Sequence, residues 1–228
     1  MSIHLIVMAK APVAGFAKTR LVPPLTHAQA AELADAMLCD MLARPWPGFA
    51  RHLCVSGESD RFEAAARDGW TLSRQADGDL GRRLDTASRA AFAAGATAVA
   101  FLGTDAPDLP DAILEELLAA LDAGADLVLG PATDGGYYTI ATRVHQPVLF
   151  EAMPWSQPGL CEATIAAAQR EGLGIHLLPG WSDIDEVADL VRFAAAQAAI
   201  APDCNVAHRT AERVLALSSL LSAIEGAT

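Results

Sequence analysis

Lysine is almost absent from this chain: its 228 residues include only Lys10 and Lys18, and its other Lys or Arg positions are all arginine. Positive charge is scarce as a whole, with 16 Lys and Arg against 28 Asp and Glu and a formal net charge of −12. A protein of this charge does not attract polyanions, which argues against nucleic acid or an anionic membrane as a partner. A phosphate ligand would therefore need a local cluster of cations or a bridging metal ion.

Several common motifs are also missing. The four cysteines are scattered without a Cys-x-x-Cys pair, and Cys39 and Cys54 stand among apolar residues, as buried thiols do. The chain has no His and Cys spacing typical of zinc, no Gly-x-Ser-x-Gly and no His-Glu-x-x-His. The first apolar run is too short for a signal peptide, and no segment approaches membrane-spanning length. We therefore expect a protein of the reducing cytoplasm.

Apolar runs of strand length alternate with helix-like segments along the chain. A length of 228 residues and a hydrophobic content of 52% suffice for one full core. The alternation predicts a single α/β domain over residues 1–228, with a mostly parallel sheet between two layers of helices. The expected strands are Leu5–Val7, Arg51–Ser56, Trp70–Arg74, Ala98–Leu102, Asp126–Leu129, Tyr137–Ala141 and Ile175–Leu178. The expected helices are a segment from the N-cap Thr26 to about Ala43, Asp60–Arg67, one that opens near Leu80, Asp111–Leu121, Leu160–Glu171, Val187–Ile200 and Val206–Ile224, the last packed on the domain.

The loop after the first apolar run contains both lysines. It includes Pro12 and Gly15 and carries Lys10, Lys18 and Arg20. Ligands of open α/β sheets bind at the carboxyl ends of the strands, where this loop lies. An ammonium group is a good point-charge partner for phosphate, and a guanidinium can bind it in a bidentate way. The sequence thus predicts a phosphate site here; the alternative is that three cations only keep the loop solvated.

Acidic side chains follow three other predicted strands. Asp105 stands directly at a strand end, as a metal ligand would, although it could also cap the next helix, for which Asp108 is better placed. Asp134 follows another strand, and Asp183 and Asp185 follow the last. The last two point the same way in extended backbone, so one can meet Asp105 across a metal while the other caps a helix. Mg²⁺ or Mn²⁺ suits such carboxylates together with phosphate oxygens.

Two glycine-bearing turns add candidate ligand contacts. Gly78 and Gly81 lie in a turn that opens a helix, where backbone N–H groups can bind an anion. Gly135-Gly136 allows a ligand to approach the backbone closely, and Tyr137-Tyr138 beside it could contact a sugar or acceptor. Ordinary tight turns and tyrosines packed in the core explain the same residues.

The segment around Lys18 is similar to a P-loop but lacks its defining glycines. A P-loop has Gly directly before the Lys and a second Gly six residues before it, whereas this chain has Ala17 and Pro12. Its helix must also begin at the Lys, and Pro23-Pro24 interrupts that segment soon afterwards. We therefore exclude a P-loop.

Taken together, these segments resemble the GT-A-fold nucleotide-diphospho-sugar transferase superfamily. Within it, the chain is most similar to a small bacterial family once known as an uncharacterised domain and now called arsenosugar-biosynthesis-type glycosyltransferases. The ordered set spans about residues 3–192 and is more specific than any one of its members. The matching segments are Met8-Ala9-Lys10-Ala11-Pro12, Gly15, Lys18-Thr19-Arg20-Leu21, Gly78-Asp79-Leu80-Gly81-Arg82, Gly103-Thr104-Asp105-Ala106-Pro107, Gly130-Pro131-Ala132-Thr133-Asp134-Gly135-Gly136-Tyr137-Tyr138, Trp155-Ser156 and Asp183-Ile184-Asp185 with Asp189.

The resemblance implies a three-layer, Rossmann-like GT-A fold and a metal-dependent glycosyl transfer from a nucleotide-sugar to a small-molecule acceptor. It implies that Asp105 and Asp185, with Asp183 as a further candidate, hold Mg²⁺ or Mn²⁺ on the phosphates. Implied nucleotide and phosphate contacts are Lys10, Ala11, Pro12, Gly15, Lys18, Arg20, Gly78, Gly81, Arg82 and Thr104. Implied substrate contacts are Asp134, Gly135, Gly136, Tyr137 and Trp155, and implied catalytic residues are Lys18, Arg20, Asp105 and Asp134, the last as a base.

Two other functions remain open. Related nucleotidyltransferases, such as those that make molybdopterin guanine dinucleotide, clamp a triphosphate with a similar Lys/Arg loop. In those enzymes the acceptor phosphate attacks the α-phosphorus and pyrophosphate leaves, and three cations fit a triphosphate at least as well as a diphosphate-sugar. The third possibility is a non-catalytic nucleotide-binding regulator, which would keep its ligand after Asp105→Asn even without metal.

Overall fold

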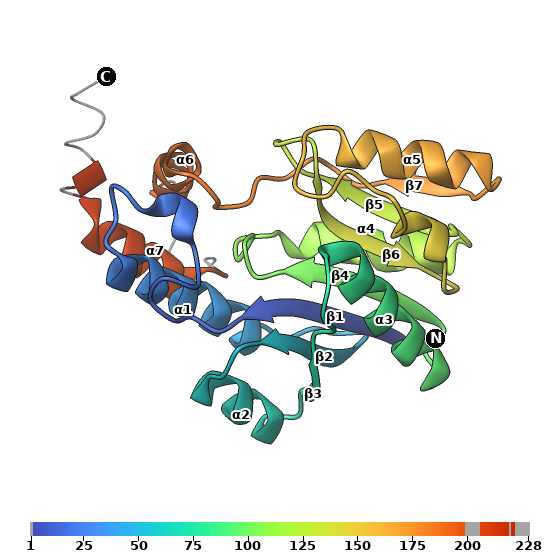
Figure 1. Ribbon diagram of the computed structural model, residues 1–228, viewed down its shortest axis with the longest axis horizontal. Helices are drawn as coiled ribbons and strands as arrows, with labels where there is room; N and C mark the ends of the chain where they lie inside the picture. The colour runs from blue at the N-terminus through green and yellow to red at the C-terminus, as the bar shows by residue number, and fades with distance from the viewer. Residues whose placement is uncertain (1, 199–205, 219, 222–228) are drawn as a thin grey trace.

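The described part of the chain forms one sheet of seven strands (Figure 1). The computed structural model describes residues 2–198, 206–218 and 220–221. The strands are β1 (Ile3–Lys10), β2 (Phe49–Ser56), β3 (Thr71–Arg74), β4 (Ala98–Gly103), β5 (Leu127–Pro131), β6 (Tyr137–Thr142) and β7 (Ile175–Leu177). They lie in the order β3-β2-β1-β4-β6-β5-β7, and β6 runs antiparallel to both of its neighbours. The mostly parallel α/β sheet expected from the sequence is confirmed.

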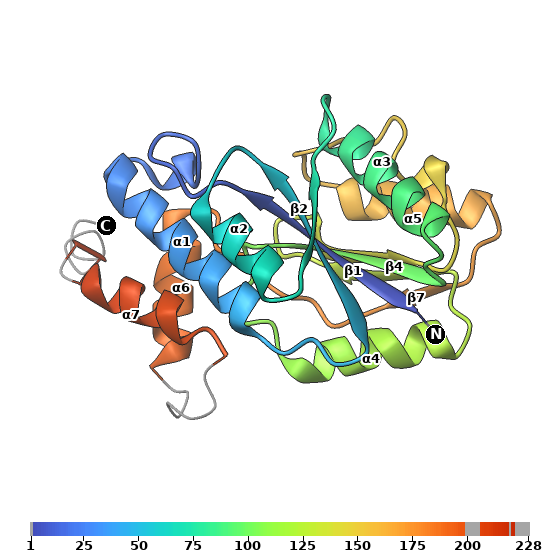
Figure 2. The ribbon, with the colours of Figure 1, turned by 90° about the horizontal axis from the view of Figure 1, so that it is seen from below.

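Helices cover both faces of the sheet, which gives three layers (Figure 2). The helices are α1 (His27–Ala43), α2 (Asp60–Arg67), α3 (Leu80–Ala93), α4 (Asp111–Asp122), α5 (Leu160–Arg170), α6 (Val187–Gln197) and α7 (His208–Ala216), with short 3-10 turns η1 (Thr19–Leu21) and η2 (Pro147–Leu149). One apolar cluster joins α1, α2 and α4 to the sheet, and another joins α3 and α5 to its opposite face.

The apolar run of β1 is explained by its central position. Ile3, Leu5 and Val7 pack in the cluster with α1, α2 and α4, whereas Ile6 packs in the cluster with α3 and α5. None of these side chains is more than 6% exposed. A strand buried on both faces needs apolar residues at successive positions, which is why this segment is continuous rather than alternating.

Helices α6 and α7 pack on α1 through a third apolar cluster, to which Met37, Phe193 and Val214 belong. The buried carboxylate of Asp40 in α1 accepts hydrogen bonds from the backbone N–H of Thr210 at 2.8 Å and from its hydroxyl at 2.7 Å. The first turn of α7 is thus capped by a neighbouring helix rather than by its own N-cap residue, Ala207, which makes no side-chain cap.

Capping chemistry sets two other helix starts. Thr26 and Gln29 form a reciprocal capping box at the start of α1, as the sequence predicts. The expectation that Asp108 caps α4 is wrong, because the N-cap is Pro110 and makes no side-chain bond. Asp108 instead accepts a hydrogen bond from Trp181 Nε1 at 3.2 Å, and burial raises the pKa of its carboxyl.

The helices predicted at Val187–Ile200 and Val206–Ile224 coincide with α6 and α7, and their predicted ends lie outside the described residues. In the described ranges, no helix combines the length and apolar character that crossing a membrane requires. The thiols of Cys39, Cys54 and Cys161 are free. Cys54 is buried as expected, but Cys39 is only half-buried because it lies beside a cavity between α1, α2 and α7.

Candidate active site at the carboxyl edge of the sheet

Four loops from separate parts of the chain meet at one edge of the sheet. They follow β1, β4, β5 and β7, which run in the same direction. The loops are residues 11–18, 104–110, 132–136 and 178–186. Backbone hydrogen bonds join three of them, from Ile184 N to Asp105 O at 2.8 Å and from Thr133 N to Trp181 O at 3.2 Å. The structure thus brings the lysine loop and the acidic loops together.

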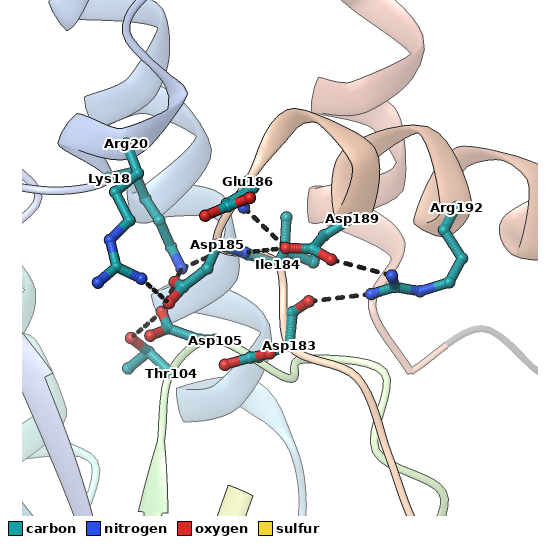
Figure 3. A network of polar contacts seen from close by, with 10 residues as sticks. All are labelled: Lys18, Arg20, Thr104, Asp105, Asp183, Ile184, Asp185, Glu186, Asp189 and Arg192. Carbon is teal, nitrogen blue, oxygen red and sulfur yellow. Dashed lines mark hydrogen bonds and ion pairs between the residues drawn. The ribbon is translucent and has the colours of Figure 1, made fainter. Parts of the chain in front are cut away.

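Lys18 lies at the centre of this arrangement (Figure 3). Its Nζ is 2.6 Å from Asp105 Oδ1 and 2.9 Å from Asp185 Oδ1, and it donates to Ile184 O at 2.5 Å. The Lys18 side chain is 7% exposed, whereas those of Asp105 and Asp185 are 41% and 34% exposed. Burial lowers the pKa of Lys18, but the two carboxylates outweigh it and raise that pKa overall. The Thr104 hydroxyl lies 3.4 Å from the same Asp105 oxygen.

Lys18 reaches this position through an unusual backbone conformation. It has φ 50° and ψ 39°, in the left-handed region, directly before η1. A residue with a Cβ pays on the order of 1 kcal/mol or more for this conformation, so the surrounding contacts must hold it there. Arg20 lies two residues later, with Nη1 3.5 Å from Asp185 Oδ2 and a side chain that is 59% exposed.

Asp189 and Arg192 fix the loop that carries Asp183 and Asp185. Asp189 Oδ2 accepts hydrogen bonds from the backbone N–H of Asp185 at 3.0 Å and of Glu186 at 2.7 Å. Arg192 binds Asp189 Oδ1 at 2.9 Å and the carbonyl of Asp183 at 3.1 Å. The prediction that Asp183 or Asp185 caps α6 is therefore wrong, because Asp189 does so from within the helix and leaves both side chains directed away from it (Figure 3).

Asp183 is a carboxyl in an unfavourable place for negative charge. Burial, followed by the nearby Asp185 and Asp134, raises its pKa to about 6. Asp134 itself is exposed, and its Oδ1 accepts the backbone N–H of Gly136 at 2.8 Å. Gly135, between Asp134 and Gly136, has φ 88°, a conformation that favours glycine. The turn aims one carboxylate oxygen at its own backbone and leaves the other for solvent or a ligand.

The lysine loop is fixed at its start and exposed in its middle. Ala11 is 1% exposed, and its N–H donates to Ser56 O at 2.8 Å, which extends the β1–β2 ladder by one residue. Pro12 is half-buried, Gly15 is exposed, and the Phe16 side chain is 46% exposed. This loop therefore presents apolar as well as basic surface at the edge of the site.

The turn before α3 is held by two residues that the sequence patterns do not single out. Gln75 Nε2 donates to Ala9 O at 3.1 Å and to Cys54 O at 3.0 Å, and so bridges β1 and β2 near their carboxyl ends. Arg83 donates to Gln75 Oε1 at 3.2 Å and to Gly78 O at 3.1 Å. Their position after a strand and next to a Gly-Asp turn is the only signal that could have found them.

The start of α3 and the end of β1 each carry an exposed cation. Asp79 caps α3 by accepting the N–H of Arg82 at 2.9 Å. Lys10 and the side chain of Arg82 are exposed, and neither has an ion-pair partner in the described ranges. Of the predicted phosphate contacts, these two are therefore the cations that remain available, together with the loosely paired Arg20.

Gly81 and Tyr137 have packing roles in this structure. A Cβ on Gly81 would lie 2.3 Å from Phe150 O and 2.5 Å from Trp155 Nε1, so only glycine lets that loop approach α3. Tyr137 contacts Trp155 edge-on, with ring centroids 6.4 Å apart, and burial raises the pKa of its phenol. Gly81, Tyr137 and Trp155 form one packed unit next to the turn at Gly78. Trp155 is half-buried, so only the exposed part of its side chain could contact a ligand.

The carboxylates suit a hard divalent ion chemically, since Mg²⁺ is commonly held by one or two carboxylates and completed by phosphate oxygens. Within residues 2–198, 206–218 and 220–221, no group of three or more His, Cys, Asp or Glu side chains is arranged to hold a metal by itself. Asp105 and Asp185 would be the protein ligands, and at present both accept the Lys18 ammonium. Asp183 as a third ligand stays a prediction.

A separate cavity of about 770 Å³ lies between α1, α2 and α7. Its lining includes Pro12 of the lysine loop but no other residue predicted for the site. Its three arginines are already engaged: Arg61 binds Asp35 in a bidentate way, Arg213 is paired with Glu32, and Arg209 donates to the Cys39 carbonyl at 3.2 Å. This cavity therefore plays no part in the edge site.

Residues 43–157 match the family described as "Uncharacterized protein conserved in bacteria (DUF2064)". The chain belongs to this family. Among curated proteins, none matches it. A solved structure from Desulfovibrio desulfuricans G20, provisionally assigned as a nucleotide-diphospho-sugar transferase, is 27% identical to this DUF2064 protein, with a TM-score of 0.85 over 97% of this chain and 98% of that one.

Two more distant structures share the fold. CMP:2-keto-3-deoxy-manno-octonic acid synthetase complexed with CTP has a TM-score of 0.51 and 13% identity, over 87% of this chain and 99% of that one. A cytidylyltransferase from Leptospira borgpetersenii has a TM-score of 0.51 and 12% identity, over 97% of this chain and 96% of that one. The comparisons support the nucleotide-diphospho-sugar transferase superfamily; the arsenosugar-type family stays a prediction.

Proposed function

We propose that this protein is a divalent-metal-dependent transferase that binds a nucleotide-sugar at the carboxyl edge of the sheet and passes the sugar to a small-molecule acceptor. The distribution of charge at that edge is the main support. Exposed cations lie at the end of β1 and at the start of α3, and carboxylates follow β4 and β7. A pyrophosphate with a bridging metal needs both. The similarity to the Desulfovibrio protein over nearly the whole chain supports the same class.

In this proposal the phosphates contact the exposed side chains Lys10 and Arg82 and the N-terminus of α3. These groups stabilise the negative charge that develops on the departing nucleoside diphosphate. Arg20 supplies a further cation beside Asp185. Asp105 and Asp185 would hold the divalent ion, which, when bound, neutralises charge on the leaving diphosphate.

Asp134 is proposed as the base. Its Oδ1 is fixed by the N–H of Gly136, so the carboxylate has a defined direction while its other oxygen stays free of that bond. That oxygen takes the proton of the acceptor hydroxyl as the hydroxyl oxygen bonds to the anomeric carbon of the sugar. The bond from this carbon to the diphosphate oxygen breaks, and its electron pair leaves with the diphosphate.

Nucleotidyl transfer is the second candidate, because Lys10, Arg20 and Arg82 together are enough cations for a triphosphate. In that reaction an oxygen of a phosphorylated acceptor attacks the α-phosphorus of a nucleoside triphosphate. The bond to the β-phosphate breaks, and pyrophosphate leaves.

A thermal-shift screen separates these functions. Nucleotide-sugars and nucleoside triphosphates are compared at equal concentration, each with Mg²⁺, with Mn²⁺ and with chelator, and the unphosphorylated nucleosides are the control ligands. A ligand at one hundred times its Kd adds about 2.7 kcal/mol of stability. In a domain of this size each kcal/mol raises Tm by about 2–4 °C. We expect a nucleotide-sugar with metal to give the largest shift.

A larger shift with a triphosphate than with every nucleotide-sugar would replace glycosyl transfer by nucleotidyl transfer. The variant Asp105→Asn tests the non-catalytic alternative. If the protein is an enzyme of either kind, this variant loses the metal-dependent part of the shift and turnover of the best ligand. Unchanged binding without metal, with no turnover of any donor, would contradict both enzymatic functions.

A further inference from the structure

Lys18 combines a sequence context typical of phosphate binding with a structural position between two carboxylates. We propose that its ammonium and a divalent cation are alternative occupants of the position between Asp105 and Asp185, so that metal binding releases Lys18 toward the phosphates. The inference rests on the proposed function for its phosphate partner, but the metal and lysine exchange can be measured without any nucleotide.

The contacts of Lys18 are those of a bound cation. Its ammonium has three protons, and three oxygens lie within 2.9 Å: Asp105 Oδ1, Asp185 Oδ1 and the carbonyl of Ile184. These distances are short, as in charge-assisted hydrogen bonds. All donor capacity of Lys18 is thus directed to the protein, and none is left for a phosphate. In this state Lys18 cannot make the contact that the sequence pattern predicts for it.

A metal ion would claim the same oxygens. The carboxylates come from separate loops after β4 and β7, and Lys18 is the group that joins them (Figure 3). Mg²⁺ binds carboxylate oxygens at about 2.0–2.1 Å, closer than an ammonium nitrogen can approach. Two cations that share these acceptors would repel each other strongly at such a separation. A bound divalent ion therefore leaves Lys18 with only the Ile184 carbonyl among its three acceptors.

The rest of the loop is suited to such an exchange. Thr19 and Arg20 directly after Lys18 are exposed, as are residues 13–16 shortly before it. The left-handed backbone of Lys18 is a strained conformation that its ion pairs help to hold. If a metal took the carboxylates, this constraint would be lost, and the freed ammonium would be available to the phosphate oxygens of a ligand.

The near absence of lysine makes the release directly measurable. The wild-type protein is treated with an amine-acylating reagent, with and without Mn²⁺, and modification of Lys10 and Lys18 is read by peptide mass spectrometry. Lys10 is exposed and has no part in the proposed exchange, so it serves as the internal reference. We expect the ratio of Lys18 to Lys10 modification to be low without metal and to rise several-fold with Mn²⁺. A ratio that stays constant while Mn²⁺ is bound would overturn the proposal.

A second measurement uses Mn²⁺ affinity, followed by the electron paramagnetic resonance signal of the free ion. Lys18→Met removes the ammonium and keeps much of the stem, and we expect it to bind Mn²⁺ about tenfold more tightly than wild type. Arg143→Met is the matched control, with the same charge change at an exposed residue just beyond β6, at the opposite edge of the sheet, and should bind like wild type. The double variant Lys18→Met/Asp105→Asn should lose this gain in Mn²⁺ affinity, and that loss would show that Mn²⁺ binds at the Asp105 carboxylate.

Equal or weaker Mn²⁺ binding by Lys18→Met than by Arg143→Met would show that Lys18 is a permanent cross-link rather than a competing cation. The proposal also fails if no variant binds Mn²⁺. Circular dichroism of each variant confirms that the comparison is between folded proteins. Because no nucleotide is present, these outcomes leave the thermal-shift test of the proposed function independent: either can fail while the other holds.

Discussion

The two lysines of this protein lie on either side of one loop, Lys10 at the end of β1 and Lys18 at the last residue of the loop, and their surroundings are opposite. Lys18 belongs to a paired region, formed by Lys18, Asp105, Asp185, Asp189 and Arg192, in which cations and carboxylates bind one another. Lys10 belongs to an open region, formed by Lys10, Gly78, Asp79 and Arg82, in which the two cations face solvent. Cations are paired with carboxylates in the first region, whereas they face solvent in the second.

This difference assigns separate tasks to the two regions. A buried, fully paired group contributes to holding loops in place, and its removal exposes uncompensated partners. An exposed cation without a partner adds little to stability, since even exposed ion pairs contribute only about 0–1 kcal/mol. Substitutions in the paired region should therefore change folding free energy, whereas those in the open region should change only ligand binding.

The largest effect is expected at Asp189 in the paired region. Asp189→Ala removes the acceptor of two backbone N–H groups and the partner of Arg192. The loss of such a helix cap, together with an ion pair, should lower the free energy of unfolding by about 2 kcal/mol, measured by urea denaturation. Glu162→Ala is the matched control, because Glu162 is also acidic and in the first turn of a helix, α5, but is exposed. Equal losses in the two variants would contradict a specific role of Asp189.

A smaller effect, and of another kind, is expected at Lys10. Lys10→Met should leave the free energy of unfolding unchanged and weaken nucleotide binding about tenfold, the effect of one charge-assisted hydrogen bond. Isothermal titration calorimetry with the best ligand of the thermal-shift screen measures it. Arg143→Met changes net charge equally at an exposed residue just beyond β6, at the opposite edge of the sheet. If it weakens binding as much as Lys10→Met does, the effect is long-range electrostatics and not a contact.

The sequence predicts the sheet and the meeting of loops well because both follow from local patterns. Buried runs such as that around Leu5 mark central strands, and the end of each parallel strand fixes the edge at which its loop lies. The same reasoning brings Lys18, Asp105 and Asp185 to one place. It cannot tell which of them bind one another, since this depends on side-chain directions at a left-handed residue.

Contacts between distant segments account for what the sequence could not show. Gln75 bridges the carbonyls of two strands, and Asp40 caps a helix that starts 168 residues later in the chain, at His208. Neither residue stands in a motif, because its partner is set by packing and not by spacing. The prediction of Asp108 as a cap was wrong for the same reason: Trp181 from another loop binds its carboxylate.

The smallest effect is expected at Asp183, next to the paired region. Among the described residues no cation pairs with the Asp183 carboxylate, and its pKa of about 6 in the folded protein lies above the ordinary value of 3.8. The folded state therefore binds more protons than the unfolded chain between these values, so the free energy of unfolding falls as pH rises from about 4 to about 6 and stays lower above that. The full linkage would be about 3 kcal/mol, and partial exposure reduces our expectation to about 1 kcal/mol.

Asp183→Asn removes the charge and should raise the free energy of unfolding by about 1 kcal/mol at pH 7.5 but not at pH 4, where wild-type Asp183 is already mostly protonated in the folded state. Urea denaturation at the two pH values measures the difference, and Asp122→Asn, at an exposed residue of α4, serves as the control. A gain of equal size at both pH values would mean that packing and not charge is responsible. A gain confined to pH 7.5 would show that the ionised Asp183 carboxylate destabilises the fold, first through burial and then through Asp185 and Asp134, a cost that a bound divalent cation would reduce.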